Sequence, residues 1–302
     1  YAIGVRLVGS EMCIRDSFSD AEIVRLEQNY RSTSTILNAA NELIAHNQGR
    51  LGKKLWTEGL EGEQISLYEA FNEQDEARFI VDRLQDWFNN GNPRSDAAVL
   101  YRSNAQSREL EDALLRVNMP YRIYGGHRFY ERLEIKNALA YLRLLANRND
   151  DTAIERIINV PARGIGGRTV DTIRSVAREE NIPLWQSCVK CVNGNLAGSR
   201  AVNAVLAFLE LIDKIQSECE GLELHEKVEH VIANSGLIQH HEKEGGEKAM
   251  ARKENLEELV NAAGTFDVVD PDDQVDVKSP AFLTAFLDQA SLDAGDTQAD
   301  ET

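Results

Sequence analysis

The sequence predicts an α/β part followed by an α-helical part, and three observations support this fold class. Up to residue 124, short apolar runs of strand length alternate with segments of helical periodicity, which is typical of a parallel sheet covered by helices. Beyond Gly125-Gly126, helical periodicity dominates to the end of the chain. The length of 302 residues, of which 42% are hydrophobic, exceeds one domain of usual size and predicts two packed units.

The α/β part begins with a strand that leads into a helix, and the same pattern then repeats. The candidate strands are the apolar or alternating runs at 23–26, 65–70, 97–101 and 121–124. A helix capped by Ser32 or Ser34 follows the first run, and a second helix is predicted over Asp75–Phe88. Ser103 or Asn104 can cap a third helix. Alternation of this kind predicts a parallel sheet with helices on both faces.

The α-helical part is predicted from amphipathic periods that continue past residue 125. The candidate helices are Glu134–Ala146, Asp151–Asn159, Thr169–Glu180, Ser199–Glu218, Glu223–Ser235, Lys253–Thr265 and Pro280–Ala290. The longest of them aligns an apolar stripe made of Val202, Val205, Leu206, Leu209 and Ile212. The acidic stretch 267–279, which contains Pro271 and few apolar residues, is predicted to be a loop.

The first 17 residues are set apart from the rest because they show no amphipathic period and no signal-peptide pattern. They resemble translated adapter sequence, so we interpret 1–17 as a non-native segment; the alternative is a genuine disordered extension. The expected domains are therefore an α/β domain over 18–124 and a helical domain over 125–297.

Composition limits the classes of function. A net charge of -17 argues against a generic polyanion-binding surface, so any contact with DNA must be local. Four cysteines in a long chain indicate no disulfide framework, and no apolar run approaches the length of about 20 residues that a membrane span needs. These features predict a cytoplasmic protein without a membrane segment.

A candidate phosphate site lies at LEQNYRST, residues 26–33, where the first strand meets its helix. Arg31 can make bidentate contacts to a phosphoryl oxygen, and Tyr30 offers a flat face for a base. The positive end of the helix dipole would support such a contact. By itself, a Tyr-Arg pair at a helix start is more often a capping or surface ion-pair feature.

Five motifs together resemble the UvrD/Rep/PcrA-type superfamily-one DNA helicases. LEQNYRST resembles motif IV of that family, and the other four occur in the order of the family: YRSNAQSR at 101–108, YGGHRFYERLEIKNALAYLRL at 124–144, NRNDD at 147–151 and PARGIGGRT at 161–169. The similarity extends from about Phe18 to Thr302. It implies an ATP-driven 3′→5′ helicase acting in nucleotide excision repair, mismatch repair and replication.

The resemblance also assigns a fold to each part. Residues 18–124 would be the first part of the RecA-like motor domain 2A, 125–297 the helical 2B domain, and 298–302 the start of the return to 2A. ATP and Mg²⁺ would be the cofactors of the complete enzyme. Gln28, Tyr30 and Arg31 would contact the nucleotide, with Arg31 as a catalytic arginine finger on the γ-phosphate. The chain contains no G-x-x-x-x-G-K-[ST] loop and no Mg²⁺ ligands, so hydrolysis by it alone is not expected.

Two segments are candidate contacts for the DNA backbone besides the hairpin described next. The resemblance places Arg102 and Asn104 near the single-stranded DNA; a helix cap with an exposed arginine is the alternative. Arg128 and Arg132 follow a four-residue spacing that continues to Lys136, which would place three cations on one helical face. Glutamates close by make an exposed, ion-paired helix the alternative for these cations.

The strongest signal for DNA binding is PARGIGGRT at 161–169, which resembles a helix-hairpin-helix element. Glycines let a phosphate strand approach the backbone, and flanking arginines with the next helix N-terminus favour negative charge. The expected contacts are Arg163, Gly164, Ile165, Gly166, Arg168 and Thr169, with Ile165 also anchoring the turn in the core. The alternative is an ordinary turn between two helices. Gly125 and Gly126 are candidate hinge residues for the 2B rotation of the family.

Other chemistry finds little support in the sequence. Cys188 and Cys191 lack a second ligand pair and suggest helix packing, and His127 has no second ligand at coordinating spacing, so no metal site is predicted. The partners implied by the resemblance are single-stranded DNA, the duplex junction and the excision and mismatch-repair proteins, with a monomer or a DNA-assembled dimer located at the nucleoid. The alternative function is a nonenzymatic duplex-binding or regulatory module.

Overall fold

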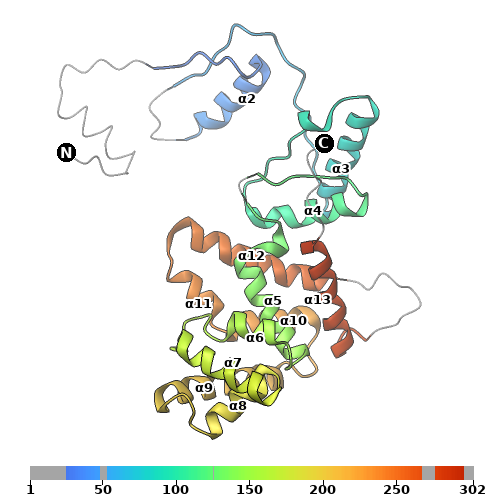
Figure 1. Ribbon diagram of the computed structural model, residues 1–302. Coiled ribbons are helices and arrows are strands. Elements are labelled where there is room, and N and C mark those ends of the chain that lie inside the picture. Colours follow the sequence, from blue (N-terminus) through green and yellow to red (C-terminus); the bar gives the residue numbers. More distant parts are fainter. Residues whose placement is uncertain (1–24, 48–52, 125, 267–275, 296–302) are drawn as a thin grey trace, which may run out of the picture. The chain divides into compact units, whose positions relative to one another are not determined.

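The computed structural model describes residues 25–47, 53–124, 126–266 and 276–295 (Figure 1). The chain divides into two compact units, Tyr1–Glu69 and Ala70–Thr302. The expected non-native segment, residues 1–17, lies outside the described residues.

The first unit is built around one helix, α2, which spans Ser34–Ala45. A single parallel bridge pairs Gln28 with Trp56. The side-chain amide of Asn41, a buried residue of α2, donates to the carbonyl of Leu55 at 2.7 Å and accepts from the Leu55 N–H at 3.0 Å. The backbone N–H and C=O of Leu55 are thereby both hydrogen-bonded to α2, so neither group lacks a partner.

The expected serine caps of α2 are wrong. The N-cap residue is Thr33, and its side chain makes no capping hydrogen bond. Asn29 organises the approach to the helix, because its Oδ1 accepts from the N–H groups of Arg31 and Ser32 at 2.9 and 2.8 Å. An asparagine side chain that mimics a backbone turn in this way is a common alternative to an N-cap serine.

The secondary-structure elements in the described residues of the second unit are all helices. The α-helices are α3 (Glu73–Asn89), α4 (Ser107–Arg116), α5 (Leu133–Ala146), α6 (Asp151–Ile157), α7 (Gly167–Glu180), α8 (Leu184–Asn193), α9 (Ser199–Glu218), α10 (Leu224–Asn234), α11 (Leu237–Glu242), α12 (Gly246–Thr265) and α13 (Pro280–Gly295). Three 3₁₀ turns accompany them: η1 (Arg94–Asp96), η2 (Asn104–Gln106) and η3 (Phe129–Glu131).

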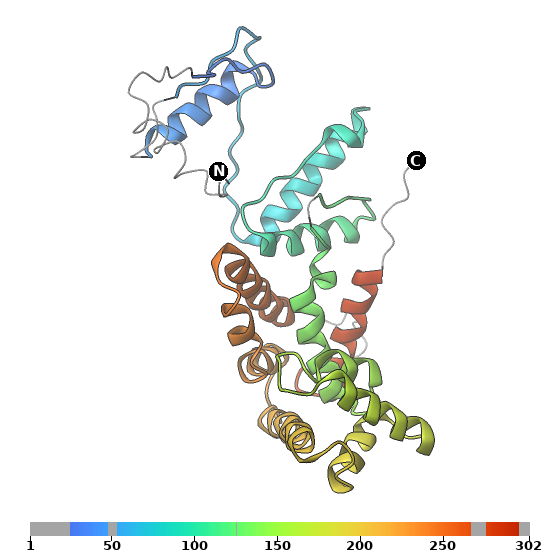
Figure 2. The ribbon, with the colours of Figure 1, turned by 60° about the vertical axis from the view of Figure 1, so that its left-hand side comes forward.

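Helix α5 lies at the centre of this unit, because it packs against α6, α10, α12 and α13 (Figures 1 and 2). Its side chains Ile135, Ala138, Leu142 and Leu144 are completely buried. A helix that is apolar on several faces is expected at the core of a helical domain. The buried residues of α5 to α13 join in one hydrophobic cluster, which also includes Phe129 from η3 and Ile165 from the α6–α7 turn.

The expected helices of the second part are confirmed, and α9 has the predicted bounds. Its buried face contains four of the five predicted stripe residues, whereas Leu206 is 39% exposed and Phe208 takes part in the core instead. The helices α8 and α11 were not among the predicted ones. Both are short, and short apolar runs carry too little periodicity to indicate a helix.

The expected strands do not form in the described residues. Segments 65–70, 97–101 and 121–124 contain no strand, and residues 23 and 24 lie outside the description. Leu67 is 96% exposed and Leu100 is 93% exposed, so these runs have the apolar pattern of strands without neighbours that cover them. A parallel strand needs a hydrogen-bonding neighbour from a distant part of a chain, and an apolar pattern alone cannot provide one. The helical half of the predicted fold class is therefore observed, and the parallel sheet is not.

Candidate nucleic-acid interface

The Tyr30-Arg31 pair lies at the exposed tip of the turn that Asn29 organises. Tyr30 is 86% exposed, and its hydroxyl donates to Gln28 Oε1 at 2.8 Å. Arg31 is exposed, and in the described residues its guanidinium has no hydrogen-bond or ion-pair partner. A tyrosine ring held at its hydroxyl end and an adjacent unpaired guanidinium leave a flat face and a fork of donors open to a ligand. The three predicted nucleotide contacts therefore lie together.

The segment with Arg102 and Asn104 is held against α12. Gln106 Oε1 accepts from the N–H groups of Arg102 and Ser103, both at 3.0 Å, and the Ser103 hydroxyl donates to Glu254. Ser103 and Gln106 form a reciprocal capping arrangement at the 3₁₀ turn η2, whereas the predicted cap of the following helix is not at Ser103, because α4 begins at Ser107 with Gln106 as its N-cap residue. Arg102 and Asn104 are exposed, as a contact with DNA requires. Asn104 lines a groove of about 360 Å³, whose other walls include Tyr101, Tyr124, His127 and Lys248.

The predicted stripe of Arg128, Arg132 and Lys136 is not a helical face. Helix α5 begins only at Leu133, so Lys136 is the one residue of the predicted stripe that lies on the helix. Arg128 is 7% exposed and lies over the Tyr121 ring at 5.2 Å. Arg132 is 8% exposed. The spacing was interpreted as a surface pattern, but the turn η3 before the helix directs both arginines into the protein.

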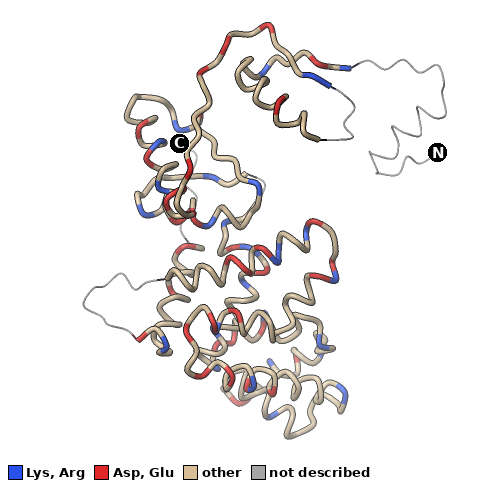
Figure 3. Tube along the Cα trace, turned by 180° about the vertical axis from the view of Figure 1, so that it is seen from behind, with Lys and Arg blue, Asp and Glu red and all other residues tan. Residues whose placement is uncertain are grey.

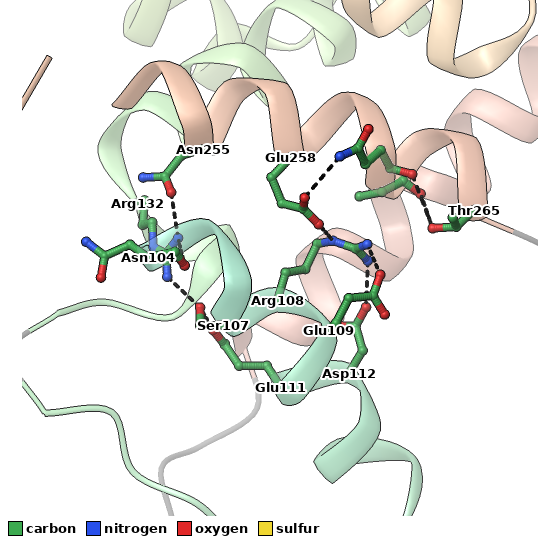
Figure 4. Close-up of polar contacts among 12 residues, drawn as sticks. Asn104, Ser107, Arg108, Glu109, Glu111, Asp112, Arg132, Asn255, Glu258 and Thr265 are labelled. Carbon is green, nitrogen blue, oxygen red and sulfur yellow. Dashed lines mark hydrogen bonds and ion pairs between the residues drawn. The ribbon is translucent and has the colours of Figure 1, made fainter. Parts of the chain in front are cut away.

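Arg132 is the centre of a buried polar network between α4, α5 and α12 (Figure 4). Its Nη1 donates to the Asn104 carbonyl and to Asn255 Oδ1, both at 2.9 Å, and its Nη2 donates to Ser107 Oγ at 2.6 Å. Burial lowers the pKa of Arg132, and the nearby Glu111 carboxyl opposes that change. These three contacts are internal, so Arg132 holds the Asn104 segment against α4 and α12.

Glu111 and Asn255 complete this network. Glu111 accepts from Ser107 Oγ at 2.6 Å, from the Tyr121 hydroxyl at 3.2 Å and from the Phe129 N–H at 3.3 Å. Burial raises its pKa in spite of these hydrogen bonds. Asn255 donates to Glu134 Oε1 at 2.6 Å. Ser107, Glu111 and Asn255 are not among the residues predicted from the sequence. Asn255 lies 123 residues from Arg132, a separation that no local pattern spans, whereas Ser107 and Glu111 stand only four residues apart but form no pattern that marks them as functional.

A second charged cluster, also drawn in Figure 4, surrounds Arg108. Its guanidinium pairs with Asp112 at 2.9 Å, with Glu258 of α12 at 2.5 Å and with Glu109. Burial raises the pKa of Asp112 to about 6, although Arg108 acts to lower it. Three carboxyl groups share one cation, so the cluster carries more negative charge than its arginine neutralises.

Asp112→Asn is expected to flatten the pH dependence of stability between pH 4 and 7. The folded-state pKa of about 6 lies above the ordinary value of 3.8, so the folded chain binds more protons across that interval. The contribution of Asp112 to the free energy of unfolding therefore falls as pH rises toward 6 and is constant well above it. Urea midpoints at pH 5 and pH 7 check this expectation. Asp82→Asn, at an exposed position of α3, is the control, and an equal flattening by both variants would contradict it.

The PARGIGGRT hairpin joins α6 to α7 and is shaped by Asn159. Asn159 Oδ1 accepts from the N–H groups of Arg163 and Ile165 at 2.8 and 3.2 Å. Ile165 is 1% exposed and belongs to the core cluster, so the predicted anchor is observed. Gly164 has a φ of +80°, a conformation that glycine adopts without strain.

The outer surface of the hairpin is bare backbone. A Cβ added at Gly164, Gly166 or Gly167 would have no neighbour within 4 Å. Packing therefore does not explain glycine at 166 and 167, where φ is not positive. Arg168, in the first turn of α7, is exposed, while Thr169 is 8% exposed. The hairpin thus presents backbone groups and one arginine side by side to solvent.

Arg163 points away from that surface. Its guanidinium donates to the carbonyls of Ile157, Pro161 and Ser235 at 3.0–3.2 Å and to the Tyr141 hydroxyl at 2.5 Å. These acceptors are internal, so the predicted phosphate contact by the Arg163 side chain does not match the geometry. In the sequence, Arg163 and Arg168 stand on either side of the glycines, and this spacing does not indicate where each side chain points. In the structure, the two side chains point in opposite directions. Of the predicted pair, Arg168 is the one available to a ligand.

The candidate hinge is only partly described. Gly125 lies outside the described residues, whereas Gly126 is exposed and has no positive φ. A Cβ at Gly126 would meet the Ile123 side chain at 3.9 Å, an ordinary contact. The local geometry therefore does not require glycine at 126.

One cluster of possible metal ligands occurs in the described part of the chain, at His240, His241 and Glu244. Arg252 already takes the position of a cation there. Its Nη1 donates to both carboxylate oxygens of Glu244 at 2.5 and 2.6 Å and to His241 Nδ1 at 3.2 Å. Burial and the Arg252 charge lower the pKa of His241. A guanidinium between two ligands would repel a metal ion, so this cluster is explained as an internal ion pair.

Charge and hydropathy give two further facts. Along the trace of the helical unit, basic and acidic residues are interspersed (Figure 3). No helix in the described ranges combines the length and the apolar character that crossing a bilayer requires.

Comparisons with known proteins identify the family of the chain. Residues 24–302 match the UvrD-like helicase C-terminal domain, and the chain belongs to that family. It is 54% identical over 285 residues to DNA helicase II of Escherichia coli (strain K12), an alignment that covers 94% of this chain and 39% of the relative. It is 40% identical over 281 residues to the ATP-dependent DNA helicase PcrA of Staphylococcus aureus (strain Mu50), with coverage of 93% and 38%.

DNA helicase II of Salmonella typhimurium is also 54% identical over 285 residues, with the same coverage of 94% and 39%. The chain therefore spans about two fifths of the length of the curated relatives that it matches. The resemblance to UvrD-type helicases that the five motifs indicated is confirmed.

Proposed function

We propose that this chain provides the duplex-holding surface and the arginine finger of an ATP-dependent 3′→5′ DNA helicase. The observation that carries the proposal is the hairpin at 164–168, where bare glycine backbone adjoins the exposed Arg168. Backbone N–H groups and one arginine recognise phosphates without reading bases, which suits a protein that moves along any sequence. The family and its helicase relatives support the same assignment.

The nucleotide contacts belong to the first unit. Tyr30 would stack on the adenine, with its hydroxyl held by Gln28, and Arg31 would stabilise the charge that develops on the γ-phosphate. The exposure of both side chains supports these roles. ATP with Mg²⁺ is the proposed cofactor, and the ligands of the metal and the phosphate-binding loop would come from another domain, because the sequence has no G-x-x-x-x-G-K-[ST] motif.

The remaining assignments follow the family. Residues 18–124 would contribute to the RecA-like domain 2A, with a sheet completed by other strands, and 125–297 would form 2B with a helix-hairpin-helix element. Arg102 and Asn104 would contact the single strand, since both are exposed. Excision and mismatch-repair proteins would be partners, and the enzyme would act at the nucleoid as a monomer or a DNA-assembled dimer.

Arg168→Ala is expected to weaken binding of the 302-residue chain to a blunt DNA duplex about equally for all sequences. Loss of one phosphate contact should also reduce the slope of log K against log salt concentration by about 0.9. Fluorescence anisotropy with two duplexes of unrelated sequence, each at several KCl concentrations, measures both quantities.

Arg200→Ala is the matched control, because Arg200 is exposed on α9 and its loss changes the net charge by the same amount. The control should leave the affinity and the slope close to those of the parent chain. Equal effects of the two variants would refute a local contact at the hairpin and would indicate a response to total charge.

A further inference from the structure

We propose that Arg163 is a positioning residue, which fixes the hairpin in its DNA-binding shape from inside the protein and does not contact phosphate. This inference rests on the proposed function of the hairpin in duplex binding. It separates two arginines that stand five residues apart in one motif and assigns them opposite roles: Arg168 acts outward and Arg163 acts inward.

The acceptors of Arg163 outside the hairpin lie in or directly after separate helices. Ile157 is the last residue of α6, Tyr141 lies on α5, and Ser235 follows α10. Nη1 donates to Ile157 at 3.1 Å and to Pro161 at 3.2 Å, while Nη2 donates to Tyr141 at 2.5 Å and to Ser235 at 3.0 Å. One side chain therefore connects the start of the hairpin to three helices.

Tyr141 extends this connection to the backbone immediately before the hairpin. Its hydroxyl accepts from Arg163 and donates to the Val160 carbonyl at 2.6 Å. The Arg163 guanidinium also lies 5.8 Å from the centre of the Tyr141 ring and 5.6 Å from that of the Phe208 ring. Within the described residues its charge has no carboxylate partner, so carbonyl oxygens and ring faces stabilise it. Such a setting suits a planar, weakly hydrated guanidinium.

The geometry requires an arginine and not merely a positive charge. Four acceptors arranged around two Nη atoms match the fixed fork of a guanidinium. A lysine ammonium has three donors at one point and a strongly hydrated charge, so it cannot reach all four acceptors. A phosphate contact differs in this respect, because lysine also binds phosphate as a point charge. Exchange of arginine for lysine therefore distinguishes the two roles.

The test compares Arg163→Lys with Arg168→Lys in the full 302-residue chain. Both substitutions exchange one cation for another, so the net charge is unchanged. Binding to a 20-base-pair blunt duplex is measured by anisotropy across KCl concentrations. Arg163→Lys is expected to lower affinity about tenfold, and Arg168→Lys is expected to change it by less than about threefold. Tyr141→Phe, which removes the hydroxyl and keeps the ring, should act in the same direction as Arg163→Lys.

Amide hydrogen exchange of the DNA-free chain is the second readout. The Ile165 N–H, which donates to Asn159, should exchange faster in Arg163→Lys and in Tyr141→Phe, and at the parent rate in Arg168→Lys. Parent-like exchange and affinity in Arg163→Lys would overturn the proposal. So would an Arg163→Ala variant with unchanged exchange and a salt slope reduced by about 0.9, because that pattern marks a direct phosphate contact. If the parent chain binds no duplex, the proposed function fails, while the exchange experiment still decides the role of Arg163.

Discussion

Arg31→Ala is expected to lower ATP hydrolysis about 10³-fold or more in a helicase that contains this chain. A suitable enzyme is Escherichia coli DNA helicase II with its matching segment replaced by this chain, since the two are 54% identical over 285 residues. An arginine finger acts on charge that develops in the transition state, so the loss should be seen in kcat and much less in ATP binding. Steady-state ATPase assays with single-stranded DNA measure kcat and KM separately.

Folding is not expected to explain that loss. Arg31 is exposed and its side chain has no internal partner among the described residues, so its removal breaks no contact there. Arg25→Ala, at another exposed arginine of the same unit, is the matched control and should retain parent activity. An Arg31→Ala enzyme with parent kcat would exclude the finger role, and one with a raised KM alone would reduce Arg31 to a ground-state contact.

Arg132→Ala is expected to lower the free energy of unfolding by about 3 kcal/mol. The variant would leave three acceptors without their donor: the Asn104 carbonyl, Ser107 Oγ and Asn255 Oδ1. Buried acceptors that lose a partner retain the cost of desolvation, and Glu111 would lose its nearby positive charge. Urea denaturation followed by circular dichroism gives the free energy of unfolding and its dependence on urea.

Arg102→Ala is the control for this experiment, because Arg102 belongs to the same segment but is exposed. Its effect should stay within about 0.5 kcal/mol. A small effect of Arg132→Ala, comparable to that of the control, would show that the buried network contributes specificity of shape and little stability.

Local periodicity predicted those parts of the fold that depend on local contacts. Helix α9 was predicted to the residue because its apolar stripe repeats from Val202 to Ile212 and faces one core. The runs at 65–70 and 97–101 were predicted as strands from the same kind of pattern, yet they have no neighbour in the described residues. Helical hydrogen bonds form within a segment, whereas strand pairing depends on a distant segment that a pattern cannot specify.

The candidate site shows the same division. Tyr30, Arg31 and Arg168 were predicted as ligand contacts, and all three side chains are exposed. Arg132 and Arg163 were predicted alongside them but satisfy their donors inside the protein. Residue type and spacing indicated which arginines lie close to the hairpin glycines and to the Asn104 segment. The direction of each side chain depends on acceptors such as Ser235 and Asn255, which lie 72 and 123 residues away.

The proposal that the hairpin holds duplex DNA is tested most directly by hydrogen exchange of the 302-residue chain with and without a blunt duplex. We expect slower exchange of the backbone N–H groups at 164–168 when duplex is added at saturating concentration, with little change along the exposed face of α9. Protection confined to other helices, or binding without any protection at the hairpin, would contradict it.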